Sequence, residues 1–205
     1  MSNDVPKRLI VGISGASGAV LGVRALEACR ELGVQTHLVV SRAGMLTVVQ
    51  ETGLAASALF AKADVHYPAS QVGAAIASGS FRTAGMLVAP CSVRTMSEIA
   101  TGVTSSLLTR AADVTLKERR PLVLMVRESP LHLGHLRTLV ALAEMGAIIL
   151  PPMPAFYAKP ASVAELVDQI VGRSLDLFGL DWNAVRRWGE DLATLGGGEG
   201  GGETE

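Results

Sequence analysis

Apolar segments of strand length recur along the chain and alternate with longer stretches of helical periodicity. The apolar segments are RLIVGI at 8–13, THLVVS at 36–41, GMLVAP at 85–90, PLVLMV at 121–126 and AIILPP at 147–152. Nearly continuous apolar runs of this length are typical of parallel strands that are buried on both faces. We therefore expect an α/β fold, in which βα units build a doubly wound parallel sheet inside a three-layer αβα sandwich of the Rossmann or flavodoxin-like type.

The helices between these segments can be placed by the spacing of their side chains. Residues 19–32 put Leu21, Ala25 and Ala28 on one side, and Gly33 stands where the helix would end. The same reasoning predicts helices at 42–52, 105–118, 131–145 and 163–178, and a last amphipathic helix at 181–192.

The length and composition fit one domain of ordinary size. The chain has 205 residues, of which 49% are hydrophobic and 18% charged, so we expect a large core and some apolar surface covered by neighbouring subunits. The domain is expected to span residues 1–194, with the 181–192 helix at its C-terminal end. Residues 195–205, LGGGEGGGETE, have too little apolar surface to order themselves and are predicted to form a disordered tail.

The composition argues against a membrane protein and against a nucleic-acid-binding protein. The longest uncharged apolar stretch, 145–158, is shorter than the roughly 20 residues that a spanning helix needs. The net charge of −1 gives no field that would attract nucleic acid. The first residues show no export signal, and Cys29 and Cys91 lack the spacing of a zinc site or a disulfide framework, so we expect a cytoplasmic protein.

The first apolar segment ends in GISGASG at 12–18, where glycine and small hydroxyl residues separate a strand from a helix. Ligands of open parallel sheets bind just beyond the carboxyl ends of the strands, so this turn is a candidate binding site. It is not the dinucleotide pattern GxGxxG, since Ser14 replaces the second glycine, and it matches neither the phosphate loop nor the nucleophile elbow. Its amides and the Ser17 hydroxyl suit a flat or phosphorylated ligand, and a merely tight turn is the alternative.

Two further strand ends offer groups that bind anions. Ser41 and Arg42 follow the second segment, and Ser92, Arg94 and Thr95 open the helix after the third. Hydroxyls and free amides at helix starts bind phosphate, although the same residues also serve as ordinary N-caps. Together they suggest one ligand that carries a phosphate.

Charged and aromatic residues stand at later positions of interest. Arg127 and Glu128 follow the fourth segment directly, either as a structural ion pair or as an acid and anion-binding couple. Tyr157 lies in the proline-rich stretch PPMPAFYAKP at 151–160, and Arg173 lies within an apolar helix, where it needs a partner.

Two pairs of residues have helical spacing. Arg110 and Lys117 are seven apart and share one helix face, for which a solvated charged face is the alternative. His132 and His135 have a spacing that would suit a metal, but no third ligand stands at a recognisable distance in the sequence. We therefore expect helix-surface histidines and no metal.

These stretches together resemble the UbiX-type flavin prenyltransferase family, in particular the subgroup associated with phenolic-acid decarboxylases. The matching stretches are GISGASGA, THLVVSRAG, ASGSF with GMLVAPCSVRT, LLTRAADVTLKERRPLVLMVRESPL and PPMPAFYAKP. The resemblance implies an FMN-binding domain that joins the dimethylallyl group of dimethylallyl monophosphate to N5 and C6 of reduced FMN, without a metal. It also implies a homododecamer built of trimers, whose product, prenylated FMN, serves a UbiD-type decarboxylase.

The resemblance also assigns roles to individual residues. FMN would be bound by Gly15, Ala16, Ser17, Ser41 (its phosphate), Ser92, Val93, Arg94, Thr95 and Arg127. The catalytic residues would be Ser17, Glu51 and Glu128, with Glu128 relaying protons if it lies beside Ser17. The prenyl phosphate would be held by Arg110, Lys117, Tyr157 and Arg173, partly across a subunit interface, with Trp188 near the site.

Two other functions stay open. An FMN-dependent cysteine decarboxylase would share the fold and the flavin turn, but the catalytic histidine and the asparagine-bearing loop that it needs do not stand out in this sequence. A non-catalytic, flavin-carrying accessory subunit of a hydroxyarylic acid decarboxylase would keep the same flavin-binding residues. Such a carrier has no need of a second phosphate site, so the positions assigned to the prenyl phosphate favour catalysis.

Overall fold

A parallel sheet forms the centre of the molecule. The computed structural model describes residues 7–189, and within them six strands pair in the order β3-β2-β1-β4-β5-β6. The strands are β1 Arg8–Ile13, β2 Gln35–Val40, β3 Val65–Tyr67, β4 Gly85–Cys91, β5 Leu122–Val126 and β6 Ile148–Ile149. Every neighbouring pair is parallel, and the order runs outward in both directions from β1 and β4. This doubly wound arrangement confirms the predicted fold class.

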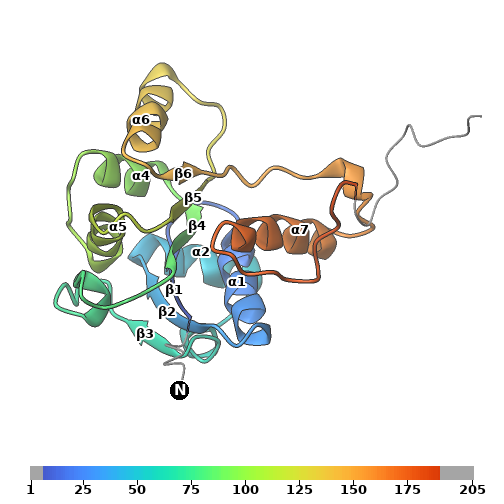
Figure 1. The fold of residues 1–205 in the computed structure, drawn as a ribbon, viewed down its shortest axis with the longest axis horizontal. Coiled ribbons are helices and arrows are strands. Elements are labelled where there is room, and N and C mark those ends of the chain that lie inside the picture. Colours follow the sequence, from blue (N-terminus) through green and yellow to red (C-terminus); the bar gives the residue numbers. More distant parts are fainter. Residues whose placement is uncertain (1–6, 190–205) are drawn as a thin grey trace, which may run out of the picture.

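Helices cover both faces of the sheet (Figure 1). The helices are α1 Ala19–Glu31, α2 Arg42–Thr52, α3 Ala56–Phe60, α4 Val93–Ala100, α5 Leu107–Lys117, α6 Leu133–Glu144 and α7 Val163–Asp176. Helices α1 and α7 pack against each other on one face, whereas α4 packs against α5 and α6 on the other.

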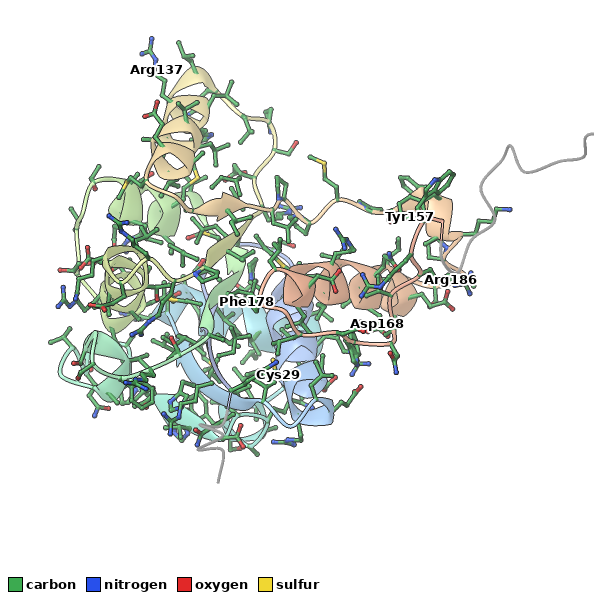
Figure 2. The ribbon with its side chains drawn as sticks, in the orientation of Figure 1. Cys29, Arg137, Tyr157, Asp168, Phe178 and Arg186 are labelled. Atoms are coloured by element: carbon green, nitrogen blue, oxygen red, sulfur yellow. The ribbon has the colours of Figure 1, made fainter. Side chains whose placement is uncertain are left out.

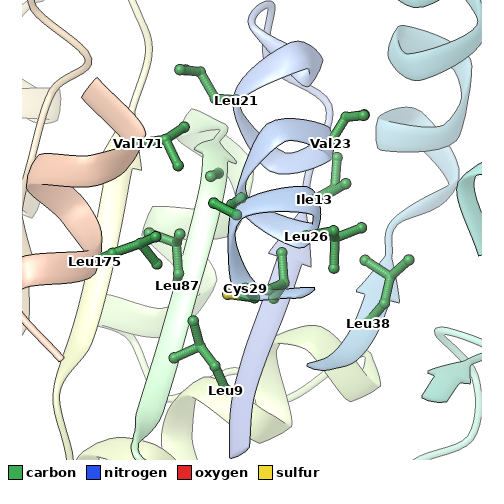
Figure 3. Packing of buried hydrophobic residues seen from close by; sticks show 14 of the residues in the cluster. Leu9, Ile13, Leu21, Val23, Leu26, Cys29, Leu38, Leu87, Val171 and Leu175 are labelled. Carbon is green, nitrogen blue, oxygen red and sulfur yellow. The ribbon is translucent and has the colours of Figure 1, made fainter. Parts of the chain in front are cut away.

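Each face of the sheet has its own core, because successive side chains of a strand point to opposite faces. Leu9 and Ile13 of β1 pack beneath Leu26 of α1 and Val171 of α7, and all four side chains are fully buried (Figure 3). Ile10, between them in the sequence, belongs to the core on the α5 side. The sheet therefore gives its strand ends a rigid support on both sides.

The strands at the two edges of the sheet differ from the prediction: β6 is shorter than the predicted segment, and β3 was not predicted. The predicted segment 147–152 is a strand only at Ile148–Ile149, because Pro151 and Pro152 have no amide hydrogen for sheet pairing. The edge strand β3 and the short helix α3 were missed, since three and five residues give no periodic signal.

The predicted helix at 181–192 is wrong over the part that the structure describes, because residues 181–189 form turns and irregular segments. The side-chain amide of the buried residue Gln169 accepts a hydrogen bond from the Arg186 amide (2.9 Å) and donates to the Arg186 carbonyl (3.0 Å). Backbone groups that a helix would use are therefore held by α7. Residues 190–192 and the predicted tail at 195–205 lie outside the described residues.

Candidate active site

A cavity of about 500 Å³ lies at the carboxyl ends of β1, β2 and β4, where the strand order reverses. In open α/β sheets this reversal opens a crevice in which ligands bind. Seven of the predicted site residues line the cavity: Gly15, Ser41, Ser92, Val93, Arg94, Thr95 and Glu128. The structure thus joins the ends of strands that are far apart in the sequence into one wall.

The cavity wall also contains residues that sequence reasoning missed. These are Ala43, Ala69, Glu98, Ser105, Ser106, Leu108 and Thr109. The Glu98 carboxylate accepts hydrogen bonds from Arg94 (2.9 Å) and Ser105 (2.7 Å). Burial raises the pKa of Glu98, but these hydrogen bonds and the charge of Arg94 outweigh burial and lower the pKa. The i, i+4 spacing of Arg94 and Glu98 was an available signal, whereas nothing in the loop before α5 indicates that it returns to the cavity.

The amino termini of α2, α4 and α5 meet at this cavity. The Ser41 hydroxyl caps α2 by accepting from the Gly44 amide (2.9 Å), Ser92 caps α4, and Ser106 caps α5. The first amides of a helix have no partner within it and carry partial positive charge. This wall therefore suits a phosphate group.

The small residues of the first turn are needed for packing. A Cβ at Gly15 would lie 2.4 Å from the Cβ of Ala43, and a Cβ at Gly44 would lie 2.5 Å from the Ile13 carbonyl oxygen. The missing side chains allow the start of α2 to approach the end of β1. At Gly15, the space that a side chain would need is therefore occupied by Ala43 of α2.

Glu51, near the end of α2, reaches the amino terminus of α1. Its carboxylate accepts hydrogen bonds from the amides of Gly18 (2.9 Å) and Ala19 (2.8 Å) and from the Ser17 hydroxyl. Partial burial raises the pKa of this carboxyl, but these hydrogen bonds and the nearby charge of Arg127 outweigh burial, so the pKa is lowered. Glu51 is thus an ionised group fixed at the edge of the first turn.

Glu128 lines the cavity, whereas Ser17 is bound by a different acid. The sequence suggested that it relays protons if it lies beside Ser17, but the carboxylate that binds Ser17 is that of Glu51. The Glu128 carboxylate accepts from the Ser129 amide (3.0 Å) and lines the cavity. The two acids therefore stand at different places around the site. Ala16, within the first turn, is buried.

Arg110 and Lys117 do not face the cavity together. Arg110 pairs with Asp113 at 2.8 Å, whereas Lys117, the last residue of α5, pairs with Glu118 at 2.5 Å and lies beside Gly79. Helix α5 starts at the cavity and runs back across the sheet, and seven residues carry the chain about 10 Å along a helix. Lys117 is therefore at the opposite edge of the sheet, where the connection to β5 begins.

A second cavity, of about 270 Å³, lies beside α7. It is lined by Tyr157, Arg173, Arg186, Arg187 and Trp188. The rings of Tyr157 and Trp188 meet edge to face, with centroids 5.6 Å apart. Figure 2 places Tyr157 and Arg186 at the far end of α7, on a part of the chain that projects from the sheet. The residues predicted for the prenyl phosphate thus form separate groups within one chain.

The partner that Arg173 was expected to need is Asp176. The Asp176 carboxylate binds Arg173 and also accepts two hydrogen bonds from Arg187, at 2.8 and 2.9 Å. Burial raises the pKa of Asp176, but the two guanidinium groups outweigh burial and lower it. One carboxylate therefore orients two of the three arginines of this cavity.

The histidine pair caps a helix. The rings of His132 and His135 stack with centroids 3.6 Å apart, and His132 Nδ1 accepts from the Gly134 amide (3.0 Å) at the start of α6. Among residues 7–189, no three His, Cys, Asp or Glu side chains are grouped so as to hold a metal. Of the helices in this range, none is both long and apolar enough to span a membrane.

Comparisons with known proteins identify the family of this chain. The family model for flavoproteins matches residues 1–175. The flavin prenyltransferase UbiX of Escherichia coli (strain K12) is 54% identical over 175 residues, which cover 85% of this chain and 93% of that protein. The chain thus belongs to the flavoproteins.

Two solved structures are similar to nearly the whole described fold. A crystal structure of AnUbiX (PadA1) in complex with FMN and dimethylallyl pyrophosphate has a TM-score of 0.88 and 46% identity, covering 89% of this chain and 97% of that one. A dodecameric FMN-dependent UbiX-like decarboxylase from Escherichia coli O157:H7 has a TM-score of 0.86 and 48% identity, covering 88% and 98%. The chain belongs to the UbiX family of flavin prenyltransferases.

Proposed function

We propose that this protein transfers the dimethylallyl group of dimethylallyl monophosphate to reduced FMN. The observation that carries the proposal is that the chain has two separate cavities lined by groups suited to anions, one at the strand ends and one, lined by arginines, beside α7. One region suits a flavin phosphate and the other suits the phosphate of a second substrate. The names of the relatives, flavin prenyltransferase and a complex with FMN and dimethylallyl pyrophosphate, support the same reaction.

The residues of the larger cavity fit FMN. Its volume of about 500 Å³ falls in the usual range for sites that bind molecules of this size. Capped helix amino termini at Ser41 and Ser92 would hold the phosphate, and apolar groups such as Val93 and Leu108 offer contacts for a planar ring. Gly15, Ala16, Ser17, Arg94, Thr95 and Arg127 complete the proposed FMN-binding set.

The chemistry divides between the flavin and the protein. When bound, reduced FMN supplies N5 and C6 as the nucleophilic atoms, while the allylic C–O bond of the donor breaks and its electron pair leaves with the phosphate. Arg110, Lys117, Tyr157 and Arg173 would neutralise the departing phosphate, because fixed positive and hydroxyl donors stabilise charge that develops in a transition state. Trp188 would shield this region from water.

Glu51 and Ser17 are proposed to move protons. The two are hydrogen-bonded at the edge of the first turn, and the lowered pKa of Glu51 keeps its carboxylate ionised, the form that can accept a proton from Ser17. Glu128, on the cavity wall, would be a second acid in contact with substrate. The net reaction adds one C5H8 unit to the flavin and releases phosphate.

The separation of the prenyl-phosphate residues supports a site built between subunits. Lys117 lies at the opposite edge of the sheet from the cavity, and Tyr157 projects beyond α7 (Figure 2). Exposed apolar side chains surround this projection and α6, namely Leu133, Leu136, Val140, Met153 and Phe156. We infer that they are covered in a homododecamer of trimers, the assembly size named for a similar structure.

The proposed recipient of the product and the state of the two cysteines bear on the compartment in which the protein works. We propose that prenylated FMN is passed to a UbiD-type decarboxylase in the cytoplasm. The two cysteines, Cys29 and Cys91, are buried and unpaired, which fits a reducing compartment.

The test is an anaerobic incubation of the full chain with reduced FMN and dimethylallyl monophosphate, followed by mass spectrometry of the released flavin. We expect a gain of one C5H8 unit that requires the donor, and a parallel reaction with the diphosphate identifies the preferred donor. Unmodified FMN that stays tightly bound would contradict the proposal and favour the flavin-carrying subunit. Unmodified FMN with CO2 released from a peptide ending in cysteine would instead favour the cysteine decarboxylase.

A further inference from the structure

The hydroxyl of Ser14 joins the two strand ends at which the order of the sheet reverses. Ser14 Oγ donates to the carbonyl of Pro90 (2.9 Å) and accepts from the amide of Ser92 (2.7 Å). The residue is fully buried, so in the folded protein both hydrogen bonds are shielded from water. This side chain touches neither cavity, yet it connects the residue before Gly15 to the residue that opens the Ser92–Thr95 turn.

The other strand ends around the cavity are linked by backbone alone. The Ser41 amide donates to Ile13 (2.9 Å), which links β2 to β1, and the Arg127 amide donates to Cys91 (3.1 Å), which links β5 to β4. Main-chain hydrogen bonds of this kind form whichever side chain the residue carries. The junction of β1 and β4 has one such bond as well, from the Ser14 amide to the Pro90 carbonyl (3.1 Å), and there the Ser14 side chain adds two further hydrogen bonds.

The junction of β1 and β4 lacks regular pairing at its end. The parallel ladder stops at Gly12 and Val88, and the pairing of β4 with β5 shifts register between Val88 and Cys91. Pro90 has no amide hydrogen, and Ser92 lies beyond the ladder. A buried amide without a partner is costly, and the Ser14 hydroxyl supplies the partner that the strand does not.

We infer that Ser14 is a positioning residue that fixes the distance between the first turn and the Ser92–Thr95 turn, and thereby the width of the flavin-binding cavity. A glycine, as in the dinucleotide pattern, would leave the Ser92 amide unbonded, and the bond from the residue-14 amide to the Pro90 carbonyl (3.1 Å) would then hold the two turns without help from a side chain. The inference rests on the proposed binding of FMN in this cavity. It explains why a hydroxyl residue stands at this place in GISGASG.

The experiment compares FMN binding by the natural protein, Ser14→Ala and a matched control, Thr36→Ala. Thr36 is also a buried hydroxyl that both donates to Asp64 (2.9 Å) and accepts from its amide (3.1 Å), but it lies near the amino end of β2, away from the cavity. We expect both variants to lower the melting temperature. Only Ser14→Ala should weaken FMN binding, by about tenfold, as for a lost buried hydrogen bond.

Equal FMN affinity in Ser14→Ala and the natural protein would overturn the inference, whereas a natural protein that does not bind FMN would instead overturn the proposed function. If Ser14→Ala does not fold, amide hydrogen exchange of the natural protein decides the question. We expect the Ser92 amide to be protected in the FMN-free protein at a level close to that of the β4 amides. Rapid exchange at Ser92 while β4 is protected would contradict the proposed role of Ser14.

Discussion

The Asp176 carboxylate accepts two parallel hydrogen bonds of 2.8 and 2.9 Å from Arg187, one from each terminal nitrogen of the guanidinium group. This geometry fixes the orientation of an arginine more strictly than a single contact does. It ties the end of α7 to the chain segment that presents Trp188. The arginine-lined cavity is therefore shaped by a carboxylate that does not line it.

Asp176→Asn is expected to weaken donor binding without affecting FMN. The amide cannot balance the charges of Arg173 and Arg187. Arg173 therefore loses its carboxylate partner, and Arg187 loses its two-point contact while its contact with Asp181 (2.9 Å) stays. We expect KM for dimethylallyl monophosphate to rise by about threefold to tenfold, an effect in the range of a charged hydrogen bond. Steady-state kinetics at saturating reduced FMN measures this, and an unchanged KM would contradict it. The FMN dissociation constant serves as the internal control.

Glu51→Gln is expected to lower prenyl transfer by about 100-fold or more, since a general acid or base contributes on that scale. The glutamine keeps the shape of the side chain but not its charge beside Ser17. FMN affinity should change little, because Glu51 does not line the cavity. Anaerobic turnover is measured beside Glu144→Gln, an exposed residue at the end of α6 that should keep full activity. Full activity in Glu51→Gln would exclude the proposed proton transfer.

Lys117→Ala and Arg173→Ala should each lower prenyl transfer by about 100-fold, as removal of a donor to a developing charge does. If these residues enter one site from different subunits, assemblies of mixed composition will contain some sites with both natural residues. We therefore expect co-expression of the two variants to restore part of the activity. Activity that stays at the level of the single variants would show that the residues belong to the same subunit's site, or to none.

Gly15→Ala is expected to destabilise the fold because its Cβ would overlap that of Ala43, at 2.4 Å. The cost should be about 1–3 kcal/mol, as for other overpacked positions. In an Ala43→Gly background the same substitution should cost clearly less. Urea unfolding of the four proteins forms a double-mutant cycle, and a coupling energy near zero would mean that the close contact does not limit the turn.

The stability of the protein should fall in acid partly through Asp64. Burial raises the pKa of this carboxyl, but hydrogen bonds from the Thr36 amide and hydroxyl outweigh it and lower the pKa below 3.8. A lowered folded-state pKa means that the stabilisation is complete above pH about 3.8 and disappears as the pH falls through the folded-state value. Melting temperatures of the natural protein and Asp64→Asn should therefore differ near neutral pH and converge in strong acid. A constant difference across this range would contradict the assignment.

The sheet and most helices could be predicted because their signals are local. Apolar runs such as 8–13 and 85–90 mark buried parallel strands. Five residues that line the cavity stand at or just after the ends of such runs, namely Ser41, Ser92, Val93, Arg94 and Thr95. Once the strand order is known, the ends of parallel strands must meet at one edge. This is why short motifs far apart in the sequence could be assigned to one site.

The remaining features depend on contacts that no local pattern encodes. The segment after Asp181 has helical periodicity, but its backbone is bound by Gln169 from another element. The hydrogen bond between Ser17 and Glu51 depends on the direction of α2 relative to α1. Glu98 lines the cavity because α4, the helix that carries it, begins there. The separation of Lys117 from the cavity follows from the length and direction of α5, which spacing on a helix face does not reveal.

The carboxylate of Glu51 at the start of α1 bears on nucleotide choice. In dinucleotide-binding proteins the helix after the first strand directs its amino terminus at the pyrophosphate. Here the amides of Gly18 and Ala19 already bind a negative charge, which repels any phosphate that approaches the same helix end. A mononucleotide can place its single phosphate at the starts of α2 or α4. The pyrophosphate of FAD or NAD would need the start of α1, which the Glu51 carboxylate already occupies.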